Sequence, residues 1–252
     1  MPAKPNIITT FERVEKKSLI SVDTALKLTR LIESHIQLDH YGEYTICNLY
    51  YDTEQYDLIR RSMDKPPYKE KMRLRSYGRA GPEDVVFLEL KKKYEGRVYK
   101  RRISFTLAEA VDYLFHGIRP SRDGQVLHEL DYFIQWYHPE PKVFLAYDRT
   151  AYQGRNNSDL RITFDRNIRY RTDCLTLSQD GGQSILDEDK VLMEIKVQNA
   201  YPLWLAHALS DLRIYPTSFS KYGRTYTQIT SSQRSNELCS PALLTPQQAV
   251  CR

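Results

Sequence analysis

Glycine is scarce in this sequence, with 10 among 252 residues. Neither a GxxxxGKS/T loop nor a GxGxxG turn occurs, which excludes the glycine-rich loops that bind phosphate at a helix N-terminus. Hydrophobic runs are also short: none approaches the roughly 20 residues that cross a bilayer. The first residues, MPAKPNIITTFERVEKK, lack the apolar segment of a signal peptide. We therefore expect a cytoplasmic protein without a membrane span, and we leave a membrane-bound partner open.

Cysteine and histidine do not form metal-ligand patterns. The four cysteines have no paired spacing, and the six histidines stand singly, without a His-x-x-His or HExxH motif. A zinc site of the usual kind is therefore not expected, and the cysteines are typical of a reducing compartment. Any metal should be a hard cation held by carboxylates.

Length and charge indicate one soluble globular domain. The chain has 37 Lys and Arg against 32 Asp and Glu, a net charge of +5, with 41% hydrophobic residues. This charge is mild for a nucleic-acid-binding protein, and no aromatic residues interleave the basic ones on the expected strands, so nucleic acid is not an expected partner. We expect one domain over residues 1–232 and a flexible tail over 233–252.

Alternation and β-branched or aromatic content predict many strands and few helices. The expected strands are 11–17, 44–51, 70–77, 84–92, 97–105, 142–152, 159–165 and 190–197. Helices are expected after Ser21 (with Ile36 on its apolar face), at 54–62, from Thr106 to Gly117, at 123–137 and at 202–213. Trp136 and Trp204 are expected to pack in the core, and 178–189 should be a polar loop. Short connections favour an α+β fold built on a large antiparallel sheet.

The stretch EKMRLRSYG carries an unusual strand pattern. Lys71, Arg73 and Arg75 alternate with Met72 and Leu74, which places three cations on one face of one strand. Similar faces recur, and a Glu-x-Lys pattern occurs three times, at Glu15/Lys17, Glu89/Lys91 and Glu194/Lys196. The opposite faces are apolar, with Phe87, Leu88, Leu90, Ile162, Phe164 and Ile195.

One explanation is a solvated sheet face, but ordinary surfaces avoid stacked cations. If the sheet closes into a barrel, the charged faces line its interior. Such an interior is stable when it holds a polyanion and a divalent metal, because cations bind phosphate oxygens and carboxylates bind the metal. We therefore expect the alternating cations to face inward, toward phosphate.

Seven segments in order resemble the motifs of the VTC (vacuolar transporter chaperone) domain, the polyphosphate polymerase branch of the triphosphate tunnel metalloenzyme superfamily. They are RVEKKSLI, KMRLRSYG, FLELKKKYEGRVYKRR, AYDRTAY, LRITFD, LMEIKV and SFSKYGR. The resemblance covers roughly residues 9–228. It implies an α+β fold in which about eight antiparallel strands form a closed β-barrel, or tunnel, with helices packed outside. It looks like a free-standing, microbial version, and one position departs from the eukaryotic pattern: Ser218 stands where those members carry an extra lysine.

The resemblance implies roles for individual residues. The catalytic cations would be Arg73, Arg75, Lys91, Arg149 and Arg161. Further substrate contacts would come from Lys17, Lys71, Lys100, Arg102, Tyr147, Lys196, Ser220 and Lys221, where alternation alone does not decide between Lys100 and Arg102. The metal would be Mn2+, with Mg2+ as the alternative, on Glu194 together with Glu15 and Glu89.

The implied activity is transfer of the γ-phosphate of ATP onto a growing inorganic polyphosphate chain. Two alternatives stay open: metal-dependent hydrolysis of triphosphate or polyphosphate, and polyphosphate binding without turnover. Arg149 and the Ser220–Lys221 pair favour synthesis, and the presence of Glu194 argues against a purely binding protein. Neither the oligomeric state nor the length of the product is encoded in a pattern that we can read.

Overall fold

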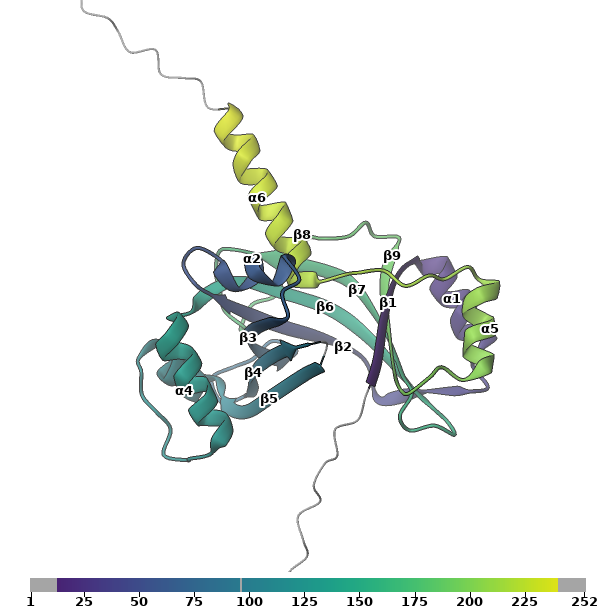
Figure 1. Cartoon of the computed structure of the whole chain (residues 1–252), viewed down its shortest axis with the longest axis horizontal. Helices are drawn as coiled ribbons and strands as arrows, with labels where there is room; N and C mark the ends of the chain where they lie inside the picture. The colour runs from purple at the N-terminus through teal and green to yellow at the C-terminus, as the bar shows by residue number, and fades with distance from the viewer. Residues whose placement is uncertain (1–12, 96, 240–252) are drawn as a thin grey trace, which may run out of the picture.

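The computed structural model describes residues 13–95 and 97–239, which form one antiparallel sheet and six helices (Figure 1). The strands are β1 (Arg13–Ser21), β2 (Ile36–Asp52), β3 (Tyr68–Tyr77), β4 (Val85–Tyr94), β5 (Arg97–Thr106), β6 (Glu140–Gly154), β7 (Arg161–Arg171), β8 (Gln183–Ser184) and β9 (Lys190–Gln198). The helices are α1 (Val22–Leu31), α2 (Asp57–Met63), α3 (Leu107–Phe115), α4 (Gln125–Tyr137), α5 (Leu203–Asp211) and α6 (Lys221–Cys239). The predicted α+β class is confirmed.

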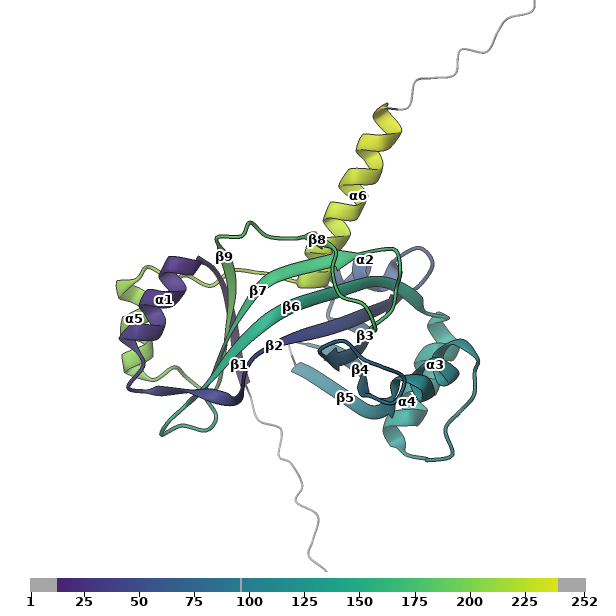
Figure 2. The same cartoon turned by 180° about the vertical axis from the view of Figure 1, so that it is seen from behind.

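The strands are arranged in the order β1-β9-β7-β6-β2-β3-β4-β5, and β8 pairs with β7. Strands β3, β4 and β5 form the expected meander, joined by short turns. Strands β2 and β6 are long, with 17 and 15 residues, and pair antiparallel along most of their length. This pair forms the middle of the sheet, as Figure 2 shows.

The predicted closed barrel is wrong. Strands β1 and β5 are the two edges of the sheet, and no ladder joins them within residues 13–95 and 97–239. One physical reason lies at the β1 edge, where the backbone carbonyl of Lys17 accepts a hydrogen bond from Thr217 N at 2.7 Å. The segment before α6 thus occupies part of the edge that closure would require. The sheet is curled and open, with nine strands instead of about eight.

Helix starts follow the predicted capping signals. Ser21 caps α1 by accepting a hydrogen bond from Thr24 N, and Thr106 and Glu109 form a reciprocal capping box at α3. Gly117 has a φ of +68°, the left-handed conformation expected after a helix end. Helix α1 ends at Leu31, so Ile36 starts β2 instead of extending the helix, although its side chain is buried in the same core.

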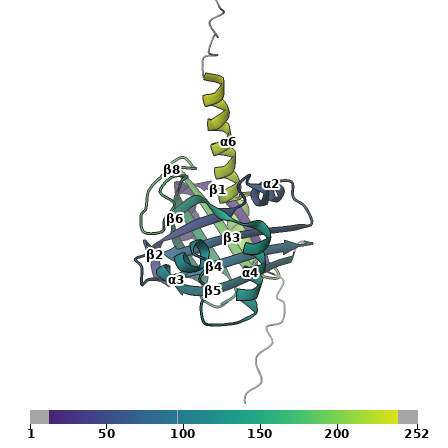
Figure 3. The ribbon, with the colours of Figure 1, turned by 90° about the vertical axis from the view of Figure 1, so that its left-hand side faces the viewer.

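Two helix pairs cover one face of the sheet (Figures 1 and 3). Helices α3 and α4 pack over the half formed by β2 to β5, around Leu74, Leu88 and Phe133. Helices α1 and α5 cover the half formed by β1, β9 and β7, around Leu28 and Ile195. We call this the outer face and the opposite one the inner face.

The inner face has a third apolar cluster, which is closed by α2 and α6. It includes Tyr50 and Leu145 from the sheet, Ile59 from α2, and Tyr222 from the first turn of α6. The rest of α6 projects away from the body of the molecule (Figure 2). None of the described helices is both long and apolar enough to cross a membrane.

Some elements differ from the prediction. Helix α6 was not expected; it extends past residue 233, where we placed the start of the tail, and residues 240–252 lie outside the described part of the chain. The segment 178–189 contains the short strand β8. Trp204 packs against the α1–α5 core, as predicted. Trp136 does not: it is 66% exposed on α4, so its expected burial is wrong.

Candidate functional site

Three consecutive strands bring basic side chains to the inner face. On β3, Arg73 and Arg75 alternate with Met72 and Leu74, which are buried under α3 and α4 on the outer face. Cross-strand pairing then fixes the neighbours on β4 and β5. Lys71 lies opposite Lys91 and Lys91 opposite Lys100, while Arg73 lies opposite Glu89 and Glu89 opposite Arg102. Both Lys100 and Arg102 therefore belong to the inner face.

Glu89 is the counter-ion of this group. Its carboxylate, 1% exposed, lies 2.7 Å from Arg73 Nη2 and 2.7 Å from Lys100 Nζ. Arg75 and Arg102 are each 3.8 Å away. Burial by itself raises the pKa of Glu89, but Arg73 and Arg75 outweigh it and lower the pKa to about 2. Glu89 is therefore always ionised, and four cations share one negative charge.

Two side chains that the sequence analysis did not single out hold the arginines in place. Asn48 accepts a hydrogen bond from Arg75 Nε at 2.9 Å, and Tyr50 OH accepts one from Arg73 Nη1 at 3.1 Å. Both lie on β2, opposite these arginines in the register. The signal was present in the sequence, since Asn48 and Tyr50 are polar residues in the alternating phase of a predicted strand.

A second ion cluster joins β1 and β9. The register sets Lys17 opposite Glu194 and Glu15 opposite Lys196. Lys196 Nζ lies 2.6 Å from Glu194 and 4.0 Å from Glu15, and Lys17 Nζ lies 3.9 Å and 3.7 Å from the same carboxylates. Although burial opposes it, Lys196 and Lys17 lower the pKa of Glu194 to about 2.

A third cluster connects β6, β7 and the start of α6. Asp165, fully buried, accepts hydrogen bonds from Arg149 Nε and Nη2 at 2.6 Å and 2.8 Å, and a further bond from Lys221 Nζ. Arg161 lies on the same face of β7 as Asp165, but it binds Asp39 and Tyr44 OH and is half exposed.

Tyr147 lies between these cations. Its ring is 4.2 Å from Lys221 Nζ and 5.1 Å from the Arg149 guanidinium, and its hydroxyl accepts a long hydrogen bond from Arg75 at 3.5 Å. Burial raises the pKa of Tyr147, but Arg75, Arg149 and Lys221 together bring it down to about 8. The cations of the inner face thus ease the ionisation of this phenol, which becomes anionic above about pH 8.

The curl of the sheet brings its two edges toward each other across the inner face. Lys91, on β4, has its pKa lowered by loss of solvation and by repulsion from Lys17, Arg73 and Lys196, although the nearby Glu15 opposes this shift. Lys17 and Lys196 belong to β1 and β9, at the far edge. Lys91 is nevertheless solvent-exposed. The sheet curls around this face, as Figures 1 and 2 show, so the inner face is concave.

Lys91 differs from the other cations in having no hydrogen-bond or ion-pair partner among the described residues. Lys71 is only weakly engaged: its Nζ lies 3.4 Å from Ser220 Oγ and 5.9 Å from the Tyr222 ring. Its pKa falls to about 8 because burial and the neighbouring Lys69, Lys91 and Lys17 outweigh Tyr50. The charges of Lys71 and Lys91 are therefore the least neutralised by protein groups, and a bound anion would stabilise them most.

The predicted carboxylate ligands do not gather at one point. Glu89 is in the β3–β5 cluster, whereas Glu15 and Glu194 share the same two lysines. Within the described residues, no group of three or more His, Cys, Asp or Glu could hold a metal ion. Beside Glu194 in the register lies Thr163, whose buried hydroxyl has no hydrogen-bond partner in the described part of the chain. Two carboxylates and a free hydroxyl suit a Mg2+- or Mn2+-sized ion that takes its other ligands from phosphate and water.

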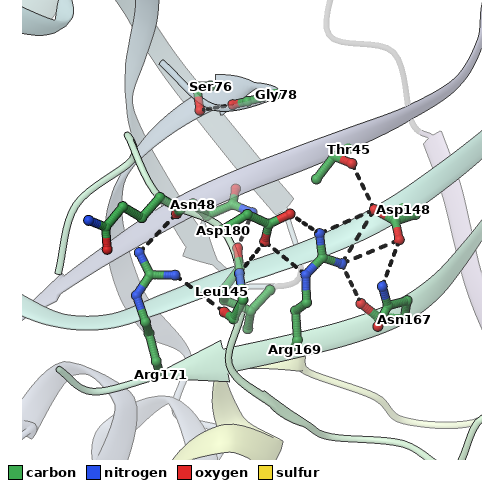
Figure 4. A network of polar contacts seen from close by, with 12 residues as sticks. Thr45, Asn48, Ser76, Gly78, Leu145, Asp148, Asn167, Arg169, Arg171 and Asp180 are labelled. Atoms are coloured by element: carbon green, nitrogen blue, oxygen red, sulfur yellow. Dashed lines mark hydrogen bonds and ion pairs between the residues drawn. The ribbon is translucent and has the colours of Figure 1, made fainter. Parts of the chain in front are cut away.

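Two arginines on the outer face, Arg169 and Arg171, are bound by protein groups (Figure 4). Arg169 binds Asp148 and Asp180, and Arg171 donates to the backbone carbonyls of residues 174, 176, 179 and 181. These arginines fasten the 172–182 loop to the strand. A cavity of about 520 Å³ lies between this loop and α6, apart from the charged inner face.

Comparison with solved structures finds two proteins that are each named "putative adenylate cyclase". The one from Bacillus halodurans has 17% sequence identity and a TM-score of 0.51, over 84% of this chain and 96% of that chain. The one from Vibrio parahaemolyticus has 14% identity and a TM-score of 0.47, over 88% and 99%. The first likeness supports the fold alone, and we draw nothing from the second. No curated protein matches the sequence.

The sequence family comparison is more specific. The VTC domain matches residues 12–230, which is most of the chain. The match covers every strand of the sheet and all three ion clusters of the inner face. This chain therefore belongs to the VTC domain family.

Proposed function

We propose that the protein is a metal-dependent polyphosphate polymerase, which transfers the γ-phosphate of ATP onto an inorganic polyphosphate chain along the inner face. Family membership supports triphosphate or polyphosphate as the substrate class. The choice of synthesis rests on the residues that the sequence motifs share with polymerases, in particular Arg149, Ser220 and Lys221.

The observation that carries the proposal is the excess of positive charge on one concave face. Ten cations converge there, and the carboxylates that pair with them in the three ion clusters are Glu15, Glu89, Asp165 and Glu194. The cations are Lys17, Lys71, Arg73, Arg75, Lys91, Lys100, Arg102, Arg149, Lys196 and Lys221. Such an excess is costly without a counter-ion, and a chain of phosphates supplies several negative charges at regular spacing.

The chemistry requires little beyond this charge. Phosphate is already nucleophilic, so the barrier lies in bringing anions together and in stabilising the charge on the transferring group. Arg73 and Arg75 are oriented in advance by Glu89, Tyr50 and Asn48, and they can offer fixed donors to phosphate oxygens. Lys71 and Lys91 add mobile charge, since Lys71 has only a long contact to Ser220 and Lys91 has no hydrogen-bond or ion-pair partner among the described residues.

A divalent metal, Mn2+ or Mg2+, would be held by Glu15 and Glu194 and would neutralise charge on the phosphate oxygens. Lys17 and Lys196 flank both carboxylates, and they hold Glu194 in the ionised form. Glu89 is a poor ligand for this purpose, because its oxygens already face four cations.

The test is a product assay on the purified full-length chain. With ATP and Mn2+, we expect acid-insoluble polyphosphate to accumulate, with little free phosphate. Lys91→Met should lose most of this activity, whereas Lys92→Met, on the outer face of the same strand and paired with Glu70 and Glu129, should keep it. Release of orthophosphate without polymer would establish a hydrolase instead. Tight polyphosphate binding without any turnover would establish a binding protein.

A further inference from the structure

An aromatic row lies at one end of the inner face. Tyr44 on β2, Tyr77 on β3 and Phe87 on β4 come from three adjacent strands, with ring centroids 6.0 Å apart for the first pair and 5.8 Å for the second. Tyr41 extends the row beyond Tyr44 at 5.8 Å. The sequence analysis grouped Phe87 with the apolar outer residues. That assignment is wrong, because Phe87 lies in phase with Glu89 and Lys91 and directly opposite Arg75.

These rings are not buried in a core. Tyr77 is 51% exposed and Tyr41 66% exposed, while Tyr44 and Phe87 are half-buried. No hydrogen bond is made by the Tyr77 side chain within the described residues. Adjacent aromatic rings from separate strands, left open to solvent, form the kind of patch that marks a binding surface.

The aromatic row adjoins the cations assigned to phosphate. The Arg102 guanidinium lies 3.4 Å from the Phe87 ring centre and 5.9 Å from that of Tyr77. Arg161 donates a hydrogen bond to Tyr44 OH at 3.3 Å, and Tyr44 lies opposite Arg149 in the register. Along β3, Tyr77 is two residues from Arg75, a separation of about 7 Å. A ribose bridges a comparable distance between a base and its first phosphates.

We propose that the exposed Tyr77 ring, flanked by Tyr44 and Phe87, is a stacking platform for the base of a nucleoside triphosphate, whose phosphates extend from there toward Arg75 and Arg73. This inference rests on the proposed function and adds to it the site of the base. Ring faces bind any base by stacking, and a purine offers the largest surface. At the opposite end of β3 and β4, Lys69 and Lys93 lie on the same face as Lys71 and Lys91. This end carries positive charge for phosphate, and we place the inorganic chain there.

The experiment compares ATP with tripolyphosphate, which has the phosphates and no base. Binding is measured by calorimetry with EDTA present, so that neither compound is turned over. In the parent we expect ATP and tripolyphosphate both to bind. Tyr77→Leu should weaken ATP about tenfold, within the range for loss of one stacking contact, and should change tripolyphosphate less than twofold. Tyr77→Phe should bind ATP as the parent does.

The matched control is Tyr94→Leu, an exposed tyrosine on the outer face of β4, which should affect neither ligand. Unchanged ATP affinity in Tyr77→Leu would overturn the platform, and so would an equal loss of both ligands, which indicates a general disturbance of the inner face. A parent that binds neither compound would overturn the proposed function itself. If the parent and Tyr77→Leu both bind ATP and tripolyphosphate equally well, the proposed function stands and only the stacking platform is excluded.

Discussion

Arg73 and Glu89 lie side by side across the β3–β4 ladder, with 2.7 Å between Nη2 and the carboxylate. Because Glu89 is buried and also faces Lys100, it sets the resting position of the cations while leaving their charges in excess. A group that both anchors and partly neutralises a charged surface has two separable effects, on the stability of the empty protein and on its affinity for anions.

Glu89→Gln should separate these effects. Removing one partner of a buried ion pair costs on the order of 3 kcal/mol, which in a domain of this size lowers the Tm by about 6 °C or more. Tripolyphosphate should then raise the Tm more in the variant than in the parent, because it replaces a lost negative charge. Thermal-shift curves with and without tripolyphosphate measure both effects. An equal ligand-induced shift in both proteins would contradict this role of Glu89.

Lys91→Met should have the opposite effect on the empty protein. Lys91 is repelled by Lys17, Arg73 and Lys196 and has no ion-pair partner in the described residues, so removing its charge should raise the Tm by about 2 °C. The stabilisation by tripolyphosphate should shrink at the same time. Lys92→Met provides the control on the outer face, where loss of contacts to Glu70 and Glu129 should not raise the Tm. A lower Tm for Lys91→Met would show that this lysine stabilises the empty fold.

Tripolyphosphate binding should weaken above pH 8. The pKa of Lys71 is lowered to about 8 by burial and by its lysine neighbours, so its charge is present below that pH and is lost above it. Ionisation of Tyr147, also with a pKa of about 8, adds a negative charge in the same range. The contribution of Lys71 should therefore be complete at pH 6.5 and nearly absent at pH 9.5.

The measurement is the ratio of the Kd of Lys71→Met to that of the parent, since ionisation of the ligand cancels in this ratio. We expect about tenfold at pH 6.5, the effect of losing one charged hydrogen bond, and close to one at pH 9.5. A ratio that stays constant between these values would mean that Lys71 does not titrate in this range.

Glu194→Gln should abolish metal-dependent turnover while the fold persists. Lys196 and Lys17 keep the Glu194 carboxylate ionised, and an amide of the same shape is a much weaker ligand for a hard cation. Mn2+ titration followed by electron paramagnetic resonance, with tripolyphosphate present, gives a readout that does not depend on activity. Glu43→Gln, an exposed carboxylate paired with Arg166, is the control. Unchanged Mn2+ affinity in Glu194→Gln would exclude this ligand.

Local patterns predicted the faces of the sheet well. Alternation alone assigned Arg73 and Arg75 to one side and Met72 and Leu74 to the other, because a strand repeats every two residues whatever its neighbours are. The capping signals at Ser21 and Thr106 were equally local and were confirmed.

The features that were not predicted correctly depend mostly on contacts between residues that are distant in the sequence. The pairing of Arg149 with Asp165, which the sequence analysis did not predict, follows from the register of β6 and β7, and this register cannot be read from a short motif. The open edge of the sheet depends on Thr217, about 200 residues from the β1 backbone that it contacts. Phe87 was placed on the wrong face because it is apolar, although its phase along β4 was already that of Glu89.

Helix α6 begins at the inner face and ends far from it. Its first residue, Lys221, binds Asp165, and the preceding Ser220 faces Lys71, while Tyr222 is fixed by stacking on Tyr50 and by a hydrogen bond to Asp52. The helix has 19 residues, a length of about 28 Å. Because Tyr222 fixes the first turn, a partner that bound the far end of α6 and tilted it would change the positions of Ser220 and Lys221 together. Conversely, an anion that displaced Ser220 and Lys221 would change the tilt of the helix.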